Sequence, residues 1–183
     1  TNVFELAGKT AGLLGLGNIG KQVAARLQSF GTQIQYYDLI HLNTKDEELL
    51  SVTYVSLETL FETSDIISIH VPLIDETHHL VDKRLIDLMK PSSILINTSR
   101  GSVIDEKYLI KALNNKLISG AGLDVFEQEP IDPHNPLLVM ENVIVTPHSA
   151  GNNWDAWSRR AKFGYSNIAN IVKGGVPKSL VKL

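Results

Sequence analysis

Three glycines between a strand-like run and a helix-like run constrain the fold of this chain more than any other feature. Gly15, Gly17 and Gly20 lie in the segment GLGNIG, directly after the run TAGLL at 10–14. At such a junction the backbone N–H groups that begin a helix face outward and attract an anion. Because three glycines at this spacing also occur in ordinary turns, the motif indicates a phosphate site only where a strand precedes it and a helix follows.

The residues around the glycines meet that condition. Ile19, Val23, Leu27 and Phe30 recur at helical spacing and predict a helix over 19–30. Strand and helix patterns then alternate without an internal repeat, as in successive βαβ units. Most of the strands are apolar on both faces, so we predict an α/β fold with a doubly wound, mostly parallel sheet of the Rossmann type. The predicted strands are 10–14, 33–37, 66–69, 93–97, 119–125 and 143–145, and the later helices are 57–62, 82–89, 106–114 and 155–173.

Length and composition set the number of domains. A chain of 183 residues with 43% hydrophobic side chains buries one ordinary core. We expect a dinucleotide-binding domain over 1–150, followed at 151–183 by a C-terminal helix and tail. The first residue is Thr1 rather than Met, and the opening segment reads as the end of another element, so we expect a piece of a longer protein.

Charge and composition argue against several classes of partner. A net charge of −3 and a pI near 6.0 provide no broad basic surface for nucleic acid. The sequence has no cysteine, which excludes a disulfide framework and a thiolate metal site. No apolar run approaches the roughly 18 residues that a membrane span needs, and no signal segment is visible. We expect a soluble protein without membrane contact and, since no signal segment is visible, a cytoplasmic one.

The cofactor follows from the acidic residue that ends the second predicted strand. Gly15 permits the tight turn, Gly17 lets a pyrophosphate approach the backbone, and Gly20 allows close packing of helix and strand. Asp38 ends the run QIQYYD, 18 residues after Gly20, where an acid is expected to bind the ribose hydroxyls. The next residues, Leu39 to His41, include no Arg or Lys to hold a 2′-phosphate. The sequence therefore favours NAD over NADP.

Charged side chains follow three later strands of the predicted sheet. Arg100 lies in INTSRGS, Asp124, Glu127 and Glu129 lie in GLDVFEQEP, and His148 lies in VIVTPHSAG. Because the carboxyl ends of parallel strands meet at one edge, these groups converge on one crevice. A cation, a carboxylate and an imidazole are the groups that reduction of a 2-keto acid requires. We interpret His148 as the proton donor, Glu129 as its orienting carboxylate and Arg100 as the cation that binds the substrate carboxylate.

The other histidines fit this chemistry less well. His70 also follows a strand, but the neighbouring Val71 and Pro72 suit a pocket wall better than an acid. The remaining four lie in polar loop contexts and form no recognisable metal site with a carboxylate: His41, His78, His79 and His134. We therefore expect no metal.

Five motifs in order resemble the D-isomer-specific 2-hydroxyacid dehydrogenases, which include D-lactate, D-3-phosphoglycerate and glyoxylate/hydroxypyruvate enzymes. They are GLGNIGKQVA, HVPL, INTSRG, GAGLDVFEQEP and TPH, and the resemblance runs from about Leu6 to the end of the chain. It implies that Arg100, Glu129 and His148 are catalytic, with Glu129 preferred to Glu127 by its spacing from Arg100. It also implies a further set of residues around the cofactor: Asn18, Ile19, Val71 and Pro72 against it, Thr98 near its nicotinamide end, and Asp124 at the carboxamide.

Two departures from the family pattern affect the substrate side. After TPH the chain continues SAGNNWDAW, where the family often has a Gly and a Thr, so the pocket wall beyond His148 is unusual. We interpret Trp154 and Trp157 as core or helix-start packing rather than substrate contacts. The resemblance also implies a substrate-binding domain before the cofactor domain, to which the segment 151–183 would return, and a homodimer formed by paired cofactor domains.

Several other functions remain open at the level of sequence. An NAD-sensing corepressor of the same fold would keep the same three site residues. A phosphite dehydrogenase shares the architecture, whereas Glu129 disfavours a formate dehydrogenase. An S-adenosylmethionine methyltransferase also uses a glycine-rich turn and an acid, but it has no place for Arg100, Glu129 and His148.

Overall fold

The chain forms two compact units that divide between His148 and Ser149. The computed structural model describes residues 4–180, so the outermost residues of the two predicted domains, 1–3 and 181–183, lie outside the described part. The first unit contains every predicted site residue. The second consists of a short segment followed by one long helix and the residues after it.

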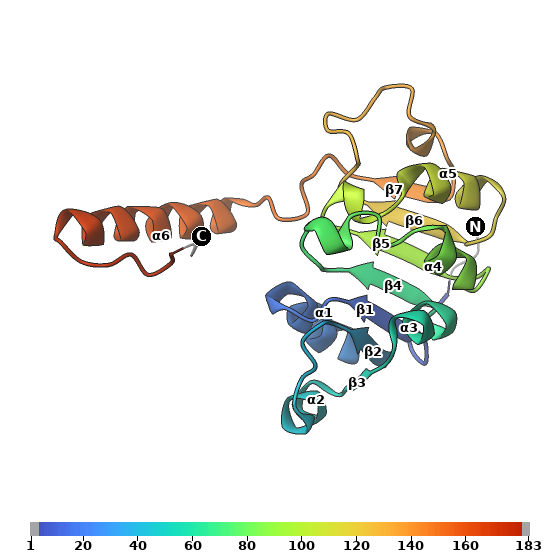
Figure 1. The fold of residues 1–183 in the computed structure, drawn as a ribbon, viewed down its shortest axis with the longest axis horizontal. Helices are drawn as coiled ribbons and strands as arrows, with labels where there is room; N and C mark the ends of the chain where they lie inside the picture. Colours follow the sequence, from blue (N-terminus) through green and yellow to red (C-terminus); the bar gives the residue numbers. More distant parts are fainter. Residues whose placement is uncertain (1–3, 181–183) are drawn as a thin grey trace. The chain divides into compact units, whose positions relative to one another are not determined.

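The first unit is built on one sheet whose strands are all parallel (Figure 1). The strand order is β3-β2-β1-β4-β5-β6-β7. The chain therefore winds outward from β1 in one direction and from β4 in the other, which places a topological switch point between these two strands. The predicted doubly wound α/β fold is confirmed. The strands are β1 Thr10–Leu14, β2 Gln33–Tyr37, β3 Val52–Tyr54, β4 Ile66–Ile69, β5 Ile94–Asn97, β6 Gly120–Leu123 and β7 Val143–Val145.

Most of the connecting helices begin where the sequence provides a cap. Ser56 accepts a hydrogen bond from the Thr59 N–H at 3.1 Å, and Asp105 accepts one from the Tyr108 N–H at 3.1 Å, so each side chain caps the helix that follows it. The α-helices are α1 Asn18–Gln28, α2 Thr44–Leu50, α3 Leu57–Thr63, α4 Lys83–Leu88 and α5 Glu106–Asn114, and the 3-10 helices are η1 Asp75–Thr77, η2 Gly101–Val103 and η3 Pro136–Leu138. Only α2, β3 and the 3-10 helices were not predicted.

Two apolar clusters lie on opposite faces of the sheet. Consecutive strand residues point to opposite faces, and Leu13 and Leu14 of β1 accordingly belong to different clusters. Leu13 packs with Ala24 of α1 and Tyr36 of β2, whereas Leu14 packs in a larger cluster with buried residues of α3, α4 and α5. This double cover explains why the strand sequences are apolar on both faces.

The predicted apolar face of the first helix is partly wrong. Ile19 is 65% exposed and Phe30 is 58% exposed, so neither belongs to the core. The helix ends at Gln28, and Gly31 beyond it has a φ of +70°. Phe30 therefore lies in the turn rather than on the helix, and Ile19 lies in the exposed first turn beside the glycine motif.

The second unit contains α6, Trp154–Val172, whose N-cap Asn153 accepts a hydrogen bond from the Ala156 N–H at 2.8 Å. Trp154 and Trp157 lie at its start, as predicted, but they are 91% and 59% exposed, so the expectation of core packing is wrong within this unit. None of the residues of α6 is buried. Within residues 4–180, no helix combines the length and the apolar character needed to cross a bilayer.

Candidate active site

The glycine turn between β1 and α1 is closely packed at its two ends and open in the middle. Gly15 has a φ of +94°, and a Cβ there would lie 2.9 Å from the His70 carbonyl carbon. A Cβ on Gly20 would lie 2.3 Å from the Gly15 carbonyl oxygen, whereas one on Gly17 would meet nothing within 4 Å. Gly17 is also the N-cap of α1 and has no side chain to bond the first helical N–H groups. The turn therefore leaves helix N–H groups and space for an anion at Gly17.

Asp38 stands beside this turn at the end of β2. One carboxylate oxygen, Oδ2, accepts a hydrogen bond from the Leu16 N–H at 2.7 Å, and Oδ1 accepts one from the Ile40 N–H at 3.0 Å. The first bond ties the acid to the glycine turn, and the second fixes the loop that follows it. This position fits the ribose-binding role predicted for Asp38.

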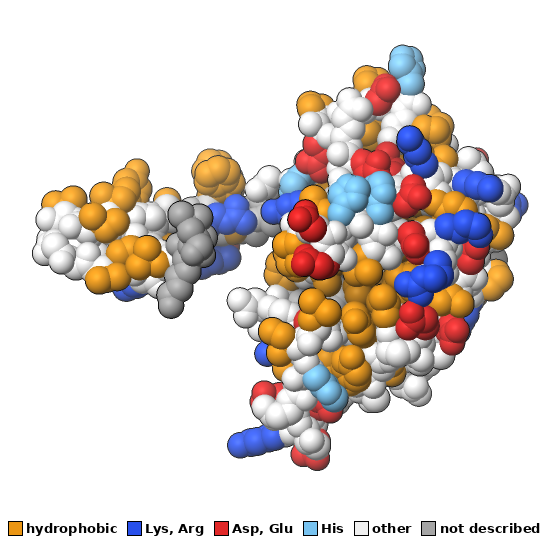
Figure 2. All heavy atoms as spheres, in the orientation of Figure 1, with side chains coloured by type: hydrophobic (Ala, Val, Ile, Leu, Met, Phe, Trp, Pro, Cys, Tyr) orange, Lys and Arg blue, Asp and Glu red, His pale blue; other side chains and the backbone are white. Residues whose placement is uncertain are grey.

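A largely apolar pocket of about 340 Å³ connects the glycine turn with the end of β4. Gly15, Gly17 and Asp38 line it together with Val71 and Pro72. The face drawn in Figure 2 shows apolar side chains gathered over this region of β1, β4 and α1. An open backbone cradle, an acid and an apolar wall in one pocket fit the phosphate, ribose and base of a dinucleotide.

His70 forms part of the pocket wall. Its Nε2 is buried and accepts or donates no hydrogen bond within the described residues. Burial lowers the pKa of His70 to about 4, so the ring is neutral at pH 7. A neutral, buried imidazole does not act as an acid at that pH, which agrees with its interpretation as a wall.

Asp124 directly follows β6, at the edge of the sheet where the carboxyl ends of the strands lie. It is buried, and its Oδ1 accepts a hydrogen bond from the Thr146 hydroxyl at 2.5 Å. Its backbone N–H donates to the Asn97 carbonyl at 3.0 Å, which links the ends of β5 and β6. Thr98, the residue after β5, is exposed at the same edge. Both residues thus lie at strand ends, where the predicted nicotinamide contacts require them.

Glu129 and His148 form the one direct contact among the predicted catalytic residues. Oε2 of Glu129 lies 2.7 Å from Nδ1 of His148, and its Oε1 accepts a hydrogen bond from the Phe126 N–H at 3.1 Å. The bond to His148 is the main reason that the pKa of the Glu129 carboxyl lies below its ordinary value. His148 has a φ of +50°, a strained conformation for a non-glycine residue that places its ring against the carboxylate.

Arg100 lies near this pair without contacting it. Its guanidinium donates a hydrogen bond to the Ser99 carbonyl at 2.7 Å, and the side chain is exposed. Its charge nevertheless contributes to lowering the pKa of Glu129. Asn97, buried at the end of β5, fixes the loop because its side-chain nitrogen donates to the Arg100 carbonyl at 2.9 Å.

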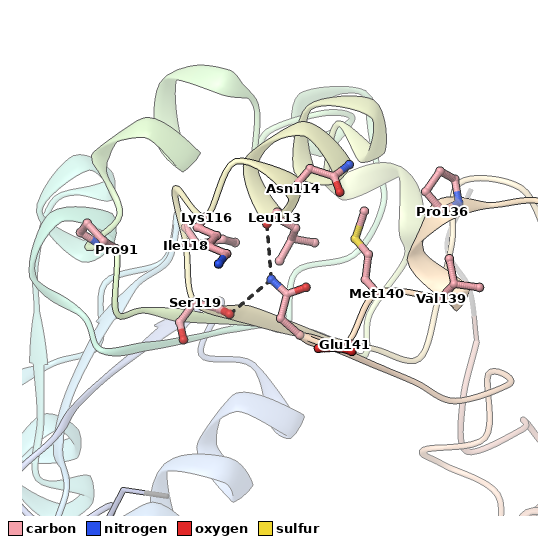
Figure 3. A pocket seen from close by; sticks show the side chains of 11 residues that line it. Pro91, Leu113, Asn114, Lys116, Ile118, Ser119, Pro136, Val139, Met140 and Glu141 are labelled. Carbon is pink, nitrogen blue, oxygen red and sulfur yellow. Dashed lines mark hydrogen bonds between the residues drawn. The ribbon is translucent and has the colours of Figure 1, made fainter. Parts of the chain in front are cut away.

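Two further cavities differ in their relation to these residues. One of about 260 Å³ lies directly beside Glu129 and His148 and is otherwise lined by Phe126, Pro130, Ile131 and Pro147. A second, of about 590 Å³, lies by α5 and the residues that precede β6 and β7, and no predicted site residue lines it (Figure 3). The smaller cavity is therefore the candidate for a small substrate.

Sequence reasoning missed two residues of this site. Thr146 holds Asp124, and Asn97 holds the Arg100 loop. Both lie inside motifs that had been identified, TPH and INTSRG, and both precede a residue with a predicted role. Their polar side chains at strand ends were the available signal. Among residues 4–180, no group of three or more His, Asp or Glu side chains is arranged to hold a metal ion.

Known proteins similar to this chain share one family description. The sequence model described as D-isomer specific 2-hydroxyacid dehydrogenase, NAD binding domain, matches residues 1–150. The glyoxylate reductase of Korarchaeum cryptofilum is 47% identical over 97% of this chain and 53% of its own length. The glyoxylate reductase of Thermofilum pendens is 45% identical over 97% of this chain and 52% of its own length. A crystal structure of D-lactate dehydrogenase with NAD+ from Lactobacillus jensenii superposes with a TM-score of 0.91 at 32% identity, covering 98% of this chain and 57% of that one.

The fold and the cofactor pocket define a dinucleotide-binding domain. A histidine–glutamate pair lies at the edge of its sheet where the strands have their carboxyl ends. More particularly, the chain belongs to the D-isomer-specific 2-hydroxyacid dehydrogenase family and corresponds to its NAD-binding domain. The predicted resemblance and the predicted cofactor, NAD, are confirmed. The chain spans about half the length of the curated relatives it matches.

Proposed function

We propose that the whole protein is an NAD-dependent oxidoreductase that interconverts a small 2-keto acid and the corresponding D-2-hydroxy acid. The observation that carries this proposal is the 2.7 Å contact between Glu129 and His148 at the edge of the sheet that also holds the cofactor pocket. The similarity to glyoxylate reductases supports a small substrate, and the 260 Å³ cavity beside the pair has a suitable size.

NAD(H), when bound, supplies or accepts the hydride at the substrate carbon. In the reductive direction the carbonyl oxygen gains negative charge and needs a proton. His148 donates it from Nε2, because its Nδ1 is engaged by Glu129, and the carboxylate stabilises the imidazolium before the transfer. A proton from water then restores the imidazolium.

Arg100 binds the substrate carboxylate in this proposal. Its guanidinium presents a fork of donors suited to a carboxylate, and its only described side-chain hydrogen bond goes to the Ser99 carbonyl. Turning from that carbonyl to a substrate therefore exchanges one hydrogen bond for a charge-assisted pair.

Three features of the whole protein stay predictions. They are the docking of 151–183 on a substrate-binding domain, the pairing of cofactor domains in a homodimer, and a cytoplasmic location. Sedimentation of the full-length protein tests the second. None of the contacts described above favours a phosphite dehydrogenase, a corepressor or a methyltransferase, so none of these is proposed.

Fluorescence titration with NADH and a turnover assay test the proposed function together. The 183-residue chain is expected to bind NADH, because the cofactor pocket lies wholly within it. It is expected to turn over glyoxylate, hydroxypyruvate and pyruvate very slowly, because without a second domain water reaches the reacting carbon and the substrate is poorly positioned. The full-length protein should reduce at least one of them rapidly. A folded chain that does not bind NADH, or a full-length protein inactive on all three, contradicts the proposal.

A further inference from the structure

Two glutamates outside the predicted catalytic set bond to each other's backbone beside the Glu129 loop. Glu106 begins α5, and Glu127 lies in the loop after β6. Oε2 of Glu106 accepts a hydrogen bond from the Glu127 N–H at 2.9 Å, and Oε1 of Glu127 accepts one from the Glu106 N–H at 3.1 Å. We call this reciprocal pair the carboxylate clasp.

Each glutamate of the clasp has one further partner. His79 lies with Nε2 2.6 Å from Oε1 of Glu127, and Asn135 donates to Oε1 of Glu106 at 2.7 Å. The His79 backbone is itself fixed, since its N–H donates to the Ser102 carbonyl at 2.8 Å. The clasp and its two further partners thus connect residues 79, 106, 127 and 135, and both oxygens of Glu106 and Oε1 of Glu127 accept hydrogen bonds or contact His79.

The loop held by the clasp has little room to move. A Cβ on Gly101 would lie 1.9 Å from the Phe126 carbonyl carbon and 2.4 Å from the Glu127 nitrogen, so the two chains touch backbone to backbone. Gly101 directly follows Arg100. The peptide between Phe126 and Glu127 is therefore packed against the Arg100 loop on one side and bonded to Glu106 on the other.

This same peptide region supports Glu129. The Phe126 N–H donates to Oε1 of Glu129 at 3.1 Å, while Oε2 of Glu129 faces His148. We propose that Glu106 and Glu127 are positioning residues that fix the 126–127 peptide and thereby keep the Glu129 carboxylate against His148. Their importance for the reaction rests on the proposed function, whereas the positioning itself is a property of this chain.

A helix-capping role does not account for Glu106. The N-cap of α5 is Asp105, which already accepts the Tyr108 N–H, and the Glu106 carboxylate turns away from the helix toward the loop. Glu127 in turn was the alternative to Glu129 in the sequence motif EQE. The structure directs its carboxylate to Glu106 and His79 rather than to His148.

The test measures the pKa of the Glu129 carboxyl directly, and it needs neither bound cofactor nor catalytic turnover. Titration of 13C-labelled glutamate by NMR, with Glu129→Gln identifying the signal, gives the pKa of Glu129 in the 183-residue chain. Glu106→Ala is expected to raise this pKa by about half a pH unit or more, because a shifted Phe126 N–H stabilises the ionised carboxylate less. Glu62→Ala, an exposed glutamate on α3, is the matched control and should leave it unchanged.

A milder variant keeps the test decisive if Glu106→Ala does not fold. Glu106→Leu keeps a side chain of similar size but has no acceptor for the Glu127 N–H, so it loses the bond that fixes the 126–127 peptide and should raise the pKa of Glu129 in the same direction. An unchanged pKa of Glu129 in a folded variant with a lower melting temperature would show a purely structural role and overturn the proposal. Failure of the proposed function would appear instead in the turnover assay, with the NMR result unaffected.

Discussion

The two halves of the sheet build their parts of the site by different means. On the half formed by β1, β2 and β4, the backbone makes the site: Gly15 and Gly20 are closely packed, Gly17 is open, and Asp38 is held by two N–H groups. On the half formed by β5, β6 and β7, side chains hold other side chains and the loop backbone in place. A site made by backbone is readable from a short motif, whereas one made by side-chain contacts requires the structure.

The largest expected effect is a loss of reduction rate without a matching loss of NADH affinity, which would distinguish the two halves of the sheet by function. In the full-length protein, His148→Ala should lower the rate of keto-acid reduction by roughly 10²–10⁴-fold, the usual loss for a general acid. NADH affinity should change only a few-fold, because His148 lies outside the cofactor pocket. Steady-state kinetics and fluorescence titration measure the two quantities. His134→Ala, which removes an exposed loop histidine, is the control, and near-normal turnover of His148→Ala would show that another group supplies the proton.

His70 provides the next effect, on stability. Its pKa in the folded chain is about 4, below the ordinary value of 6.5, so the unfolded chain takes up this proton first as the pH falls. The free energy of unfolding should therefore decrease between pH 6.5 and about 4, by about 3 kcal/mol from this group. Urea denaturation at a series of pH values measures it.

A variant isolates the contribution of His70 from those of the carboxylates. His70→Leu keeps an apolar wall and removes the titrating ring, so its stability should lose less as the pH falls. Below about pH 4, where His70 is protonated in both the folded and the unfolded chain, the two profiles should have the same slope. Profiles that run parallel between pH 6.5 and 4 as well would contradict the low pKa. His134→Gln should reproduce the original profile.

The predicted strands and helices show what sequence reasoning achieves and where it ends. The strands 10–14, 33–37, 66–69 and 143–145 and the helix 106–114 were predicted with the observed bounds. In most of them the apolar pattern matches burial, whereas the run 143–145 is apolar although Ile144 is exposed. The segment TKDEELL was missed, since its helix α2 buries no residue and has no apolar face to read. The following strand, VTY, has only three residues.

For the site, the sequence predicted the types of group but not their contacts. It placed Glu129 and His148 at neighbouring strand ends, and the structure brings them to 2.7 Å. It could not separate the roles of Glu127 and Glu129 by physical argument, because two glutamates two residues apart in a loop have no fixed direction. Only the positions of Glu106 and His79, 21 and 48 residues earlier, decide where Glu127 points.

A smaller effect is expected for the choice between NADH and NADPH, on the half of the sheet formed by β1, β2 and β4. Asp38→Ala should weaken NADH binding. The difference in binding free energy between NADH and NADPH should shrink by about 1–3 kcal/mol, since a carboxylate binds ribose hydroxyls and repels a 2′-phosphate. Titration with both cofactors measures the margin. Asp38→Asn keeps the shape and removes the charge, so it should relax discrimination with less loss of NADH affinity. Equal affinity of the original chain for both cofactors would contradict the role of Asp38.

The smallest effect tests whether the backbone itself makes the cofactor site. Gly17→Ala adds a methyl group where no atom lies within 4 Å, at a backbone φ of −71° that alanine adopts readily. The free energy of unfolding should change by less than about 1 kcal/mol, yet the Kd for NADH should rise about tenfold, or 1.4 kcal/mol, because the methyl group stands on the approach to the helix N–H groups. The same substitution at Gly20 should instead destabilise the fold by about 1–3 kcal/mol, since its Cβ would lie 2.3 Å from the Gly15 carbonyl oxygen. One methyl group thus distinguishes the two uses of glycine in the turn, and unchanged NADH affinity in Gly17→Ala would show that the cofactor does not approach the backbone there.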